Sequence, residues 1–125
     1  MRFPENLRYG PEHEWSEVAP GHVVTVGITD YAQDQLGDVQ WVELPRVGAE
    51  VELGAAFVEV ESTKTASEVY APCSGRVVEV NESLVGDPEQ VNTDPYAAWF
   101  VRIQASRPEE LDRLRSAEEY AAELA

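Results

Sequence analysis

Hydrophobic and polar residues alternate over short stretches of the chain, which is the pattern of half-buried β-strands. Between residues 55 and 62, Val58 and Val60 alternate with Glu59 and Glu61. One face of this stretch is therefore apolar and the other is charged. Stretches rich in β-forming residues predict further strands at 14–18, 22–28, 39–44, 65–70, 76–81 and 99–103. The sequence predicts a mainly β fold.

Prolines and glycines separate these stretches. Pro20-Gly21 predicts the turn of a hairpin that joins the strands 14–18 and 22–28, and residues 72–75 predict a second turn. After this second turn, we expect Val78 and Val80 on one face of the strand 76–81.

Capping residues predict a short helix after the first hairpin. Asp30 is the expected N-cap, since Gln33 follows three positions later, and Gly37 stands where the helix would end. This spacing predicts about two turns of helix.

The C-terminal tail, residues 106–124, is expected to be helical. Ser106 with Glu109 and Ser116 with Glu119 have the spacing of two successive capping boxes. Apolar residues recur at helical spacing: Leu111, Leu114, Ala117, Tyr120, Ala121 and Leu124. We expect these helices to pack on the edge of the sheet.

An internal similarity relates residues 44–53 to residues 71–80, where Pro, Gly, Val and Glu recur in register. Four identities at one chosen offset give weak support for a repeat. However, the midpoint of the two copies falls near Lys64, as two related halves joined by a hairpin would require. Lys64 would then lie at a protruding tip.

The charge balance narrows the classes of partner. The chain has 125 residues, with 24 Asp and Glu against 9 Lys and Arg, so that its formal net charge is −15. This length favours one domain. A chain this acidic repels phosphate backbones and anionic lipids, so we expect no nucleic-acid and no membrane partner.

Other side chains suggest little chemistry of their own. The single cysteine, Cys73, allows no internal disulfide and is expected to be a small buried residue in a reducing cytoplasm. His13 and His22 lie in different segments without a cysteine set, so we expect no metal site. The three tryptophans, Trp15, Trp41 and Trp99, are expected mainly in the core.

Lys64 is the only lysine, while the other eight basic residues are arginines. Small hydroxyl residues surround it in the segment Ser62-Thr63-Lys64-Thr65. An amine on a flexible stem, presented by an uncrowded turn, is accessible to an enzyme that forms an amide with it. The alternative is an ordinary solvated turn lysine.

The residues around Lys64 resemble a known motif. The segment Val60-Glu61-Ser62-x-Lys64-x-x-Ser67, followed by Tyr70-Ala71-Pro72-x-Ser74-Gly75 and Val77-Val78-Glu79-Val80-Asn81, is similar to the lipoyl-attachment hairpin of the glycine cleavage system H proteins. Further similar segments follow the family's order: Leu7-Arg8-Tyr9, His13-Glu14-Trp15, residues 26–33, Leu36-Gly37-Asp38, residues 42–45, Asn92-x-Asp94-Pro95-Tyr96 and Ala117-x-x-Tyr120. The resemblance covers residues 7–124.

The resemblance implies a lipoyl-domain-like barrel-sandwich hybrid with short flanking and C-terminal helices, formed by a single domain over residues 1–125. The hairpin tip would span residues 61–68, with lipoate bound covalently to Lys64. Glu61, Ser62 and Ser67 would be neighbours in the attachment motif.

The implied protein is a non-catalytic carrier of glycine catabolism. It would take the aminomethyl group of glycine from a pyridoxal-phosphate-dependent glycine decarboxylase to a folate-dependent aminomethyltransferase. Dihydrolipoyl dehydrogenase would then reoxidise it, and lipoate-attaching enzymes would be further partners. The resemblance also suggests that Glu14 and Glu68 form one site that pairs with the ammonium of the loaded arm. The alternative is that both are ordinary surface glutamates.

Other functions remain open. A related chain can donate lipoyl groups to other enzymes without taking part in glycine cleavage, and the sequence does not separate the two roles. An unmodified adaptor of the same fold would leave Lys64 bare. A biotin carrier fits poorly, because its Met-Lys-Met tip differs from Thr63-Lys64-Thr65.

Overall fold

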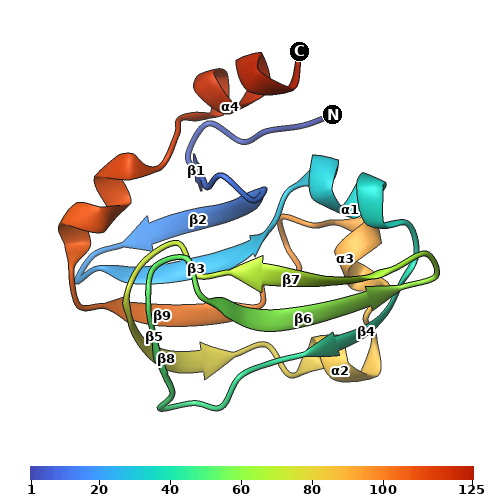
Figure 1. Ribbon diagram of the computed structural model, residues 1–125, viewed down its shortest axis with the longest axis horizontal. Helices are drawn as coiled ribbons and strands as arrows, with labels where there is room; N and C mark the ends of the chain where they lie inside the picture. The colour runs from blue at the N-terminus through green and yellow to red at the C-terminus, as the bar shows by residue number, and fades with distance from the viewer.

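Two antiparallel sheets face each other in the computed structural model, which describes residues 1–125 (Figure 1). The larger sheet contains, in spatial order, β1 (Arg8–Tyr9), β2 (Glu14–Ala19), β3 (Val23–Ile28), β9 (Val101–Ala105), β8 (Gly75–Val80) and β5 (Glu50–Val51). The smaller sheet contains β4 (Val39–Glu43), β6 (Ala56–Ser62) and β7 (Ala66–Tyr70). The mainly β, sandwich-like class predicted from the sequence is confirmed, although the sheets do not close into one barrel.

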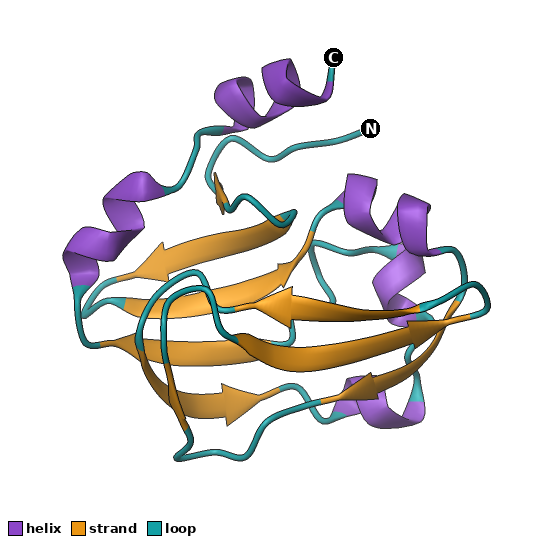
Figure 2. Ribbon diagram, in the orientation of Figure 1, coloured by secondary structure: helices purple, strands orange, loops and turns teal.

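Short helices lie around the edges of the two sheets (Figure 2). They are α1 (Asp30–Leu36), α2 (Ser83–Gly86), α3 (Gln90–Thr93), the 3₁₀ helix η1 (Pro108–Arg113) and α4 (Ala117–Leu124). None of them has the length and the hydropathy that a membrane span requires.

The main core fills the space between the sheets. Its buried side chains come from both layers and include Val24, Val26, Val77, Val101 and Ile103 of the larger sheet and Val42, Val58, Val60 and Val69 of the smaller one. In β3, β6 and β9, the alternation in the sequence points these residues inward. Burial of a side chain of this size stabilises the fold by about 1.5–3 kcal/mol.

A smaller cluster joins the two ends of the chain. Leu7, Tyr9 and Trp15 of the N-terminal region contact Ala117 and Tyr120 of α4. The rings of Tyr9 and Tyr120 are stacked with centroids 4.8 Å apart. The C-terminal helix therefore packs on the N-terminal strands (Figure 1).

Residues 48–77 fold back on themselves as one long antiparallel hairpin. Its outer part pairs Glu50 of β5 with Arg76 of β8, and its inner part pairs Glu61 of β6 with Ala66 of β7. The two copies of the internal similarity thus lie beside each other through β5 and β8. The outer part belongs to the larger sheet, and the inner part belongs to the smaller sheet.

A bulge changes the predicted face of β8. The pairing of β8 with β9 shifts between Val77 and Glu79, so that Val77 is fully buried while Val78 is 36% exposed. The prediction that Val78 shares the buried face with Val80 is therefore wrong for Val78. The two-residue period cannot reveal a bulge, which inverts the alternation locally.

Two predicted helix caps are also wrong. Thr29 is the N-cap of α1, since its hydroxyl accepts a hydrogen bond from the N–H of Ala32 at 3.2 Å, while Asp30 lies inside the helix. The 3₁₀ helix η1 has no side-chain cap, so the box expected at Ser106 is absent.

The second predicted capping box of the tail is confirmed. The Ser116 hydroxyl accepts from the N–H of Glu119 at 3.1 Å, and the Glu119 carboxylate accepts from the N–H of Ser116 at 2.9 Å.

The tryptophans have three different surroundings. Trp15 is buried as expected, but Trp41 is 47% exposed, so its expected core position is wrong. Trp99 precedes β9 and lies under the guanidinium of Arg102, 3.9 Å from its ring centroid. Cys73 is buried as expected, and burial raises the pKa of its thiol to about 12.

Candidate functional site

Lys64 is the middle of the three residues, Thr63 to Thr65, that form the turn between β6 and β7. This turn lies at the far right of Figure 1. The Ser62 hydroxyl accepts hydrogen bonds from the backbone N–H groups of Lys64 and Thr65, each at 3.2 Å, and donates to the carbonyl of Thr65 at 3.2 Å. One side chain thus fixes the backbone on both sides of the turn. The sequence singled out Ser62 by its place in the motif, and the structure shows its physical role.

The Lys64 side chain is exposed and forms no ion pair. Its stem lies beside Gly37, where a Cβ would come within 3.2 Å of Lys64 Cε. Among the motif neighbours, Glu61 is exposed and Ser67 is half-buried. The amine is therefore free to react, while the outer part of the stem packs beside Gly37.

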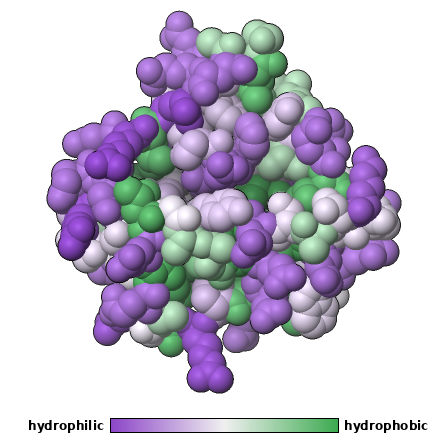
Figure 3. Space-filling model, viewed as in Figure 1, coloured by the Kyte–Doolittle hydropathy of each residue, from purple (hydrophilic) through white to green (hydrophobic).

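A groove of about 410 Å³ begins beside this turn and lies between α1 and the β6–β7 hairpin. Its lining includes the apolar side chains of Ile28, Ala32, Leu36, Val60 and Val69 and the polar residues Thr65, Ser67 and Glu68. The groove extends to Glu12, His13 and Tyr70. Figure 3 shows pale and green residues in the middle of this face, with hydrophilic residues around its rim.

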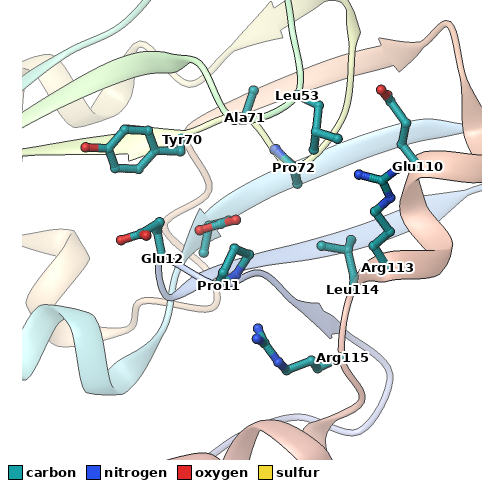
Figure 4. A pocket seen from close by; sticks show the side chains of 12 residues that line it. Pro11, Glu12, Leu53, Tyr70, Ala71, Pro72, Glu110, Arg113, Leu114 and Arg115 are labelled. Carbon is teal, nitrogen blue, oxygen red and sulfur yellow. The ribbon is translucent and has the colours of Figure 1, made fainter.

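A second pocket of about 540 Å³ adjoins the far end of the groove, because Glu12 and Tyr70 line both. In Figure 4, Glu12 and Tyr70 lie on one side of this pocket and Glu110 and Arg113 on the other. Glu14 also lines it. The groove and the pocket are therefore neighbours, with Glu12 and Tyr70 between them.

Glu14 is a buried carboxyl with an unusual environment. Its side chain is 2% exposed, and its Oε2 atom has no hydrogen-bond partner. Burial is the main cause that raises the pKa of Glu14 to about 7, and the nearby charge of Glu12 adds to this shift. Gly10 makes room for the carboxyl, since a Cβ there would overlap the Glu14 side chain. An unpaired buried carboxyl of this kind is suited to bind a cation.

The two carboxylates expected in one site lie in two adjoining hollows. Glu14 lines the larger pocket, whereas Glu68 is exposed and lines the groove. Glu12, which the sequence analysis did not single out, lines both. The only sign of this role in the sequence was that Glu12 precedes Glu14 by two residues.

A buried network supports the inner end of the groove. The Tyr120 hydroxyl is 2.8 Å from Nδ1 of His13 and 2.8 Å from the hydroxyl of Thr29. Desolvation lowers the pKa of His13, and its ring also contacts Tyr31 at 4.8 Å between centroids. Tyr120 thus connects α4 to β2 and to the start of α1, and His13 and Tyr31 line the groove.

The outer face of the smaller sheet is acidic. Glu43 lies opposite Glu59, and Glu59 lies opposite Glu68, so three carboxylates form one row across the strands. The exposed Trp41 lies opposite Glu61 in the next row. None of these glutamates takes part in the ion pairs of the molecule. Like charges in direct register destabilise a sheet, so this face is suited to a basic partner surface.

Comparison with solved structures shows which class of protein has this fold. A crystal structure of a glycine cleavage system H protein from Mycobacterium marinum matches with a TM-score of 0.90 and 42% sequence identity, covering 98% of each chain. The sandwich with its lysine-bearing hairpin thus has the fold of that H protein.

Sequence comparison gives the family. The model of the glycine cleavage H-protein family matches residues 7–125. A glycine cleavage system H protein from Geobacillus thermodenitrificans is 53% identical over 98% of this chain and 96% of its own. One from Coprothermobacter proteolyticus is 51% identical over 96% of this chain and 95% of its own. The chain belongs to the glycine cleavage H-protein family, and the resemblance drawn from its sequence is confirmed.

Proposed function

We propose that this chain is the lipoyl carrier of a glycine cleavage system, with lipoate bound through an amide to Nζ of Lys64. The observation that carries this proposal is the exposed, unpaired amine of the only lysine, on a turn braced by Ser62. Family membership supports it. The whole chain, residues 1–125, would serve as one carrier domain, and Glu61 and Ser67 would belong to the surface that a lipoate-attaching enzyme reads.

The lipoyl group, when attached, supplies a disulfide that takes up the aminomethyl group of glycine and is regenerated from the dithiol. Decarboxylation, transfer to folate and reoxidation belong to the partner enzymes: a glycine decarboxylase, an aminomethyltransferase and dihydrolipoyl dehydrogenase. This chain would bind, orient and shield the arm without a turnover of its own. A cytoplasmic location is part of the proposal, since the single cysteine suits a reducing compartment.

The groove beside Lys64 fits such an arm. Four residues of an extended strand advance about 13 Å, and the lipoyl-lysine arm has a reach of the same order. An arm lying along β7 from Thr65 would therefore pass the apolar residues of the groove and end near the level of Val69, one residue before Tyr70. The unpartnered Oε2 of Glu14 is an acceptor in the adjoining pocket.

We further propose that Glu14 and Glu68 bind the cationic end of the loaded arm. Glu68 would act in the groove and Glu14 in the adjoining pocket. A cation beside Glu14 favours its ionised form, which burial otherwise disfavours. Pairing the amine with the buried Glu14 carboxylate would limit its contact with water and delay hydrolysis.

Peptide mass mapping tests the attachment site. Protein prepared in a lipoate-competent host is expected to carry the lipoyl mass on the peptide that contains Lys64. A bare or biotinylated Lys64 in that material contradicts the carrier proposal.

Release of formaldehyde and ammonia tests the two carboxylates. Loaded wild type, Glu14→Gln and Glu68→Gln are compared in the absence of the transferase, after equal lipoylation has been verified by mass. We expect faster release from both variants. Release at the wild-type rate in either variant excludes that glutamate as a protecting group.

A further inference from the structure

Asn92 in α3 forms hydrogen bonds with both ends of the loop that joins α1 to β4. Its Oδ1 accepts from the N–H of Val39 at 2.8 Å, and its Nδ2 donates to the carbonyl of Gly37 at 2.8 Å and to Oε1 of Gln33 at 3.0 Å. These backbone partners fix the orientation of the amide, because the N–H of Val39 can only donate and the carbonyl of Gly37 can only accept. Buried Val91 anchors α3 in the core.

The loop that Asn92 holds supports the turn with the lysine. The carbonyl of Asp38, between the two residues bound by Asn92, accepts a hydrogen bond from the N–H of Thr63 at 3.0 Å. Gly37 has φ +77°, and a Cβ at this position would lie 3.2 Å from Lys64 Cε and 3.6 Å from Thr63 Oγ1. The loop therefore lies against Thr63 and Lys64, through one backbone hydrogen bond to Thr63 and close packing beside the Lys64 stem.

The turn is joined to the body of the protein where β4 pairs with the end of β6. Val39 lies opposite Ser62, and the bond from Thr63 to Asp38 continues this pairing. The Ser62 hydroxyl fixes the turn internally, but it does not fix the direction in which the hairpin end points relative to the body of the protein. That direction depends on Asp38 and Val39, which pair with Thr63 and Ser62. Both lie in the segment that Asn92 holds.

We infer that Asn92 is a positioning residue for the modification of Lys64: by clamping residues 37–39, it holds the turn in the one orientation that a lipoate-attaching enzyme engages. This inference rests on the proposed function, in which Lys64 is the attachment site. Asn92 lies outside both hollows that the arm would occupy, so its role is separate from arm binding. Small displacements of a reacting group cost an enzyme about a hundredfold in rate, so a loosened turn has a measurable effect.

The test compares Asn92→Ala with a matched control, Asn81→Ala. Asn81 is also half-buried and donates to a backbone carbonyl, that of Trp99 at 2.9 Å, but it lies after β8 and has no contact with the loop. Gln33→Ala serves as a milder variant, because it removes only one partner of the Asn92 amide. Thermal melts establish that each chain is folded at the temperature of the assay.

Three measurements are made on each unmodified chain. They are the hydrogen-exchange rate of the Thr63 amide, the kcat/KM of a lipoate ligase, and the rate at which a small acetylating reagent modifies Lys64, read by mass. In Asn92→Ala we expect faster exchange at Thr63 and a fall of about tenfold or more in ligase kcat/KM. Acetylation by the small reagent should stay within about twofold of wild type, because Lys64 is already exposed. Gln33→Ala should show smaller changes in the same direction, and Asn81→Ala should show none of them.

Two results overturn the inference. One is Thr63 exchange at the wild-type rate in Asn92→Ala. The other is a ligase kcat/KM that does not distinguish the two asparagine variants. It is either unchanged in Asn92→Ala, or it falls equally in Asn81→Ala, and an equal fall indicates a general loss of stability. The proposed function itself is contradicted only if the wild-type chain accepts no lipoate. The wild-type measurement therefore separates this outcome from a failure of the inference about Asn92.

Discussion

Lys64 contributes its amine to the surface and little to the stability of the fold. Lys64→Arg keeps the charge and a long stem beside Gly37, but the guanidinium does not form the amide. We expect this variant to lose all lipoylation by mass, while its free energy of unfolding stays within about 0.5 kcal/mol of wild type. Denaturant titration checks the second value, and a loss of several kcal/mol would contradict the exposed position.

Glu14 makes the stability of the protein depend on pH. Its carboxyl has a pKa of about 7 in the folded chain against an ordinary value of 4.5. The folded state therefore holds the proton more tightly than the unfolded state. The stabilisation from this proton is complete below pH 4.5 and is lost as the pH rises to about 7.

We expect the stability of wild type relative to Glu14→Gln to fall by about 3 kcal/mol between these pH values, at 1.36 kcal/mol per pKa unit. Urea titrations of both proteins across this pH range give the difference between their free energies of unfolding. The contributions of the other carboxylates are the same in both proteins and cancel in this difference. A pH-independent difference would show that the folded-state pKa of Glu14 is ordinary.

The two serines of the tail give a matched comparison for helix caps. Ser116 caps α4 by a reciprocal box with Glu119, whereas Ser106 has the same sequence signature and caps nothing. Ser116→Ala is expected to lower the free energy of unfolding by about 1 kcal/mol, and Ser106→Ala to leave it nearly unchanged. Denaturant titration of the two variants measures both values, and equal losses would contradict the assignment.

The difference between these two caps shows what the sequence could predict at the scale of an element. Alternating valines predicted the long strands because each strand buries one face, and the pattern depends on local neighbours only. The first tail box failed because Pro108 starts a 3₁₀ helix whose entry conformation at Arg107 does not bring Ser106 to an N–H group. The two-residue strands β1 and β5 are too short for any period to appear.

The residues of the candidate site also divide into those that the sequence could predict and those that it could not. The unique lysine and its motif marked Lys64 and Ser62, which are neighbours in the sequence. Asn92 bonds residues more than 50 positions away, and Glu12 meets Tyr70 in the lining of the two hollows only after folding, so no local pattern revealed these roles. The sequence did mark Asn92 within a similar segment, but not what it contacts.

At the scale of the whole molecule, charge governs the approach of partners. The net charge of −15 and the unpaired row of Glu43, Glu59 and Glu68 favour docking on basic surfaces. The association rate with the proposed partner, a glycine decarboxylase, is expected to fall steeply as salt shortens the Debye length from about 30 Å to about 8 Å. Stopped-flow measurements at several salt concentrations test this, and a salt-independent rate would contradict steering by charge.

The long hairpin of residues 48–77 also bears on how the chain folds. Each pair along it closes a loop only slightly larger than the pair before it, so zippering outward from the turn costs little entropy at each step. The inner pairs start the smaller sheet and the outer pairs start the larger one. We expect one local event, begun at the Thr63-Lys64 turn, to seed both layers of the sandwich. The proposed site of modification would then also be the place where folding begins, while its final orientation would wait for α3 to dock.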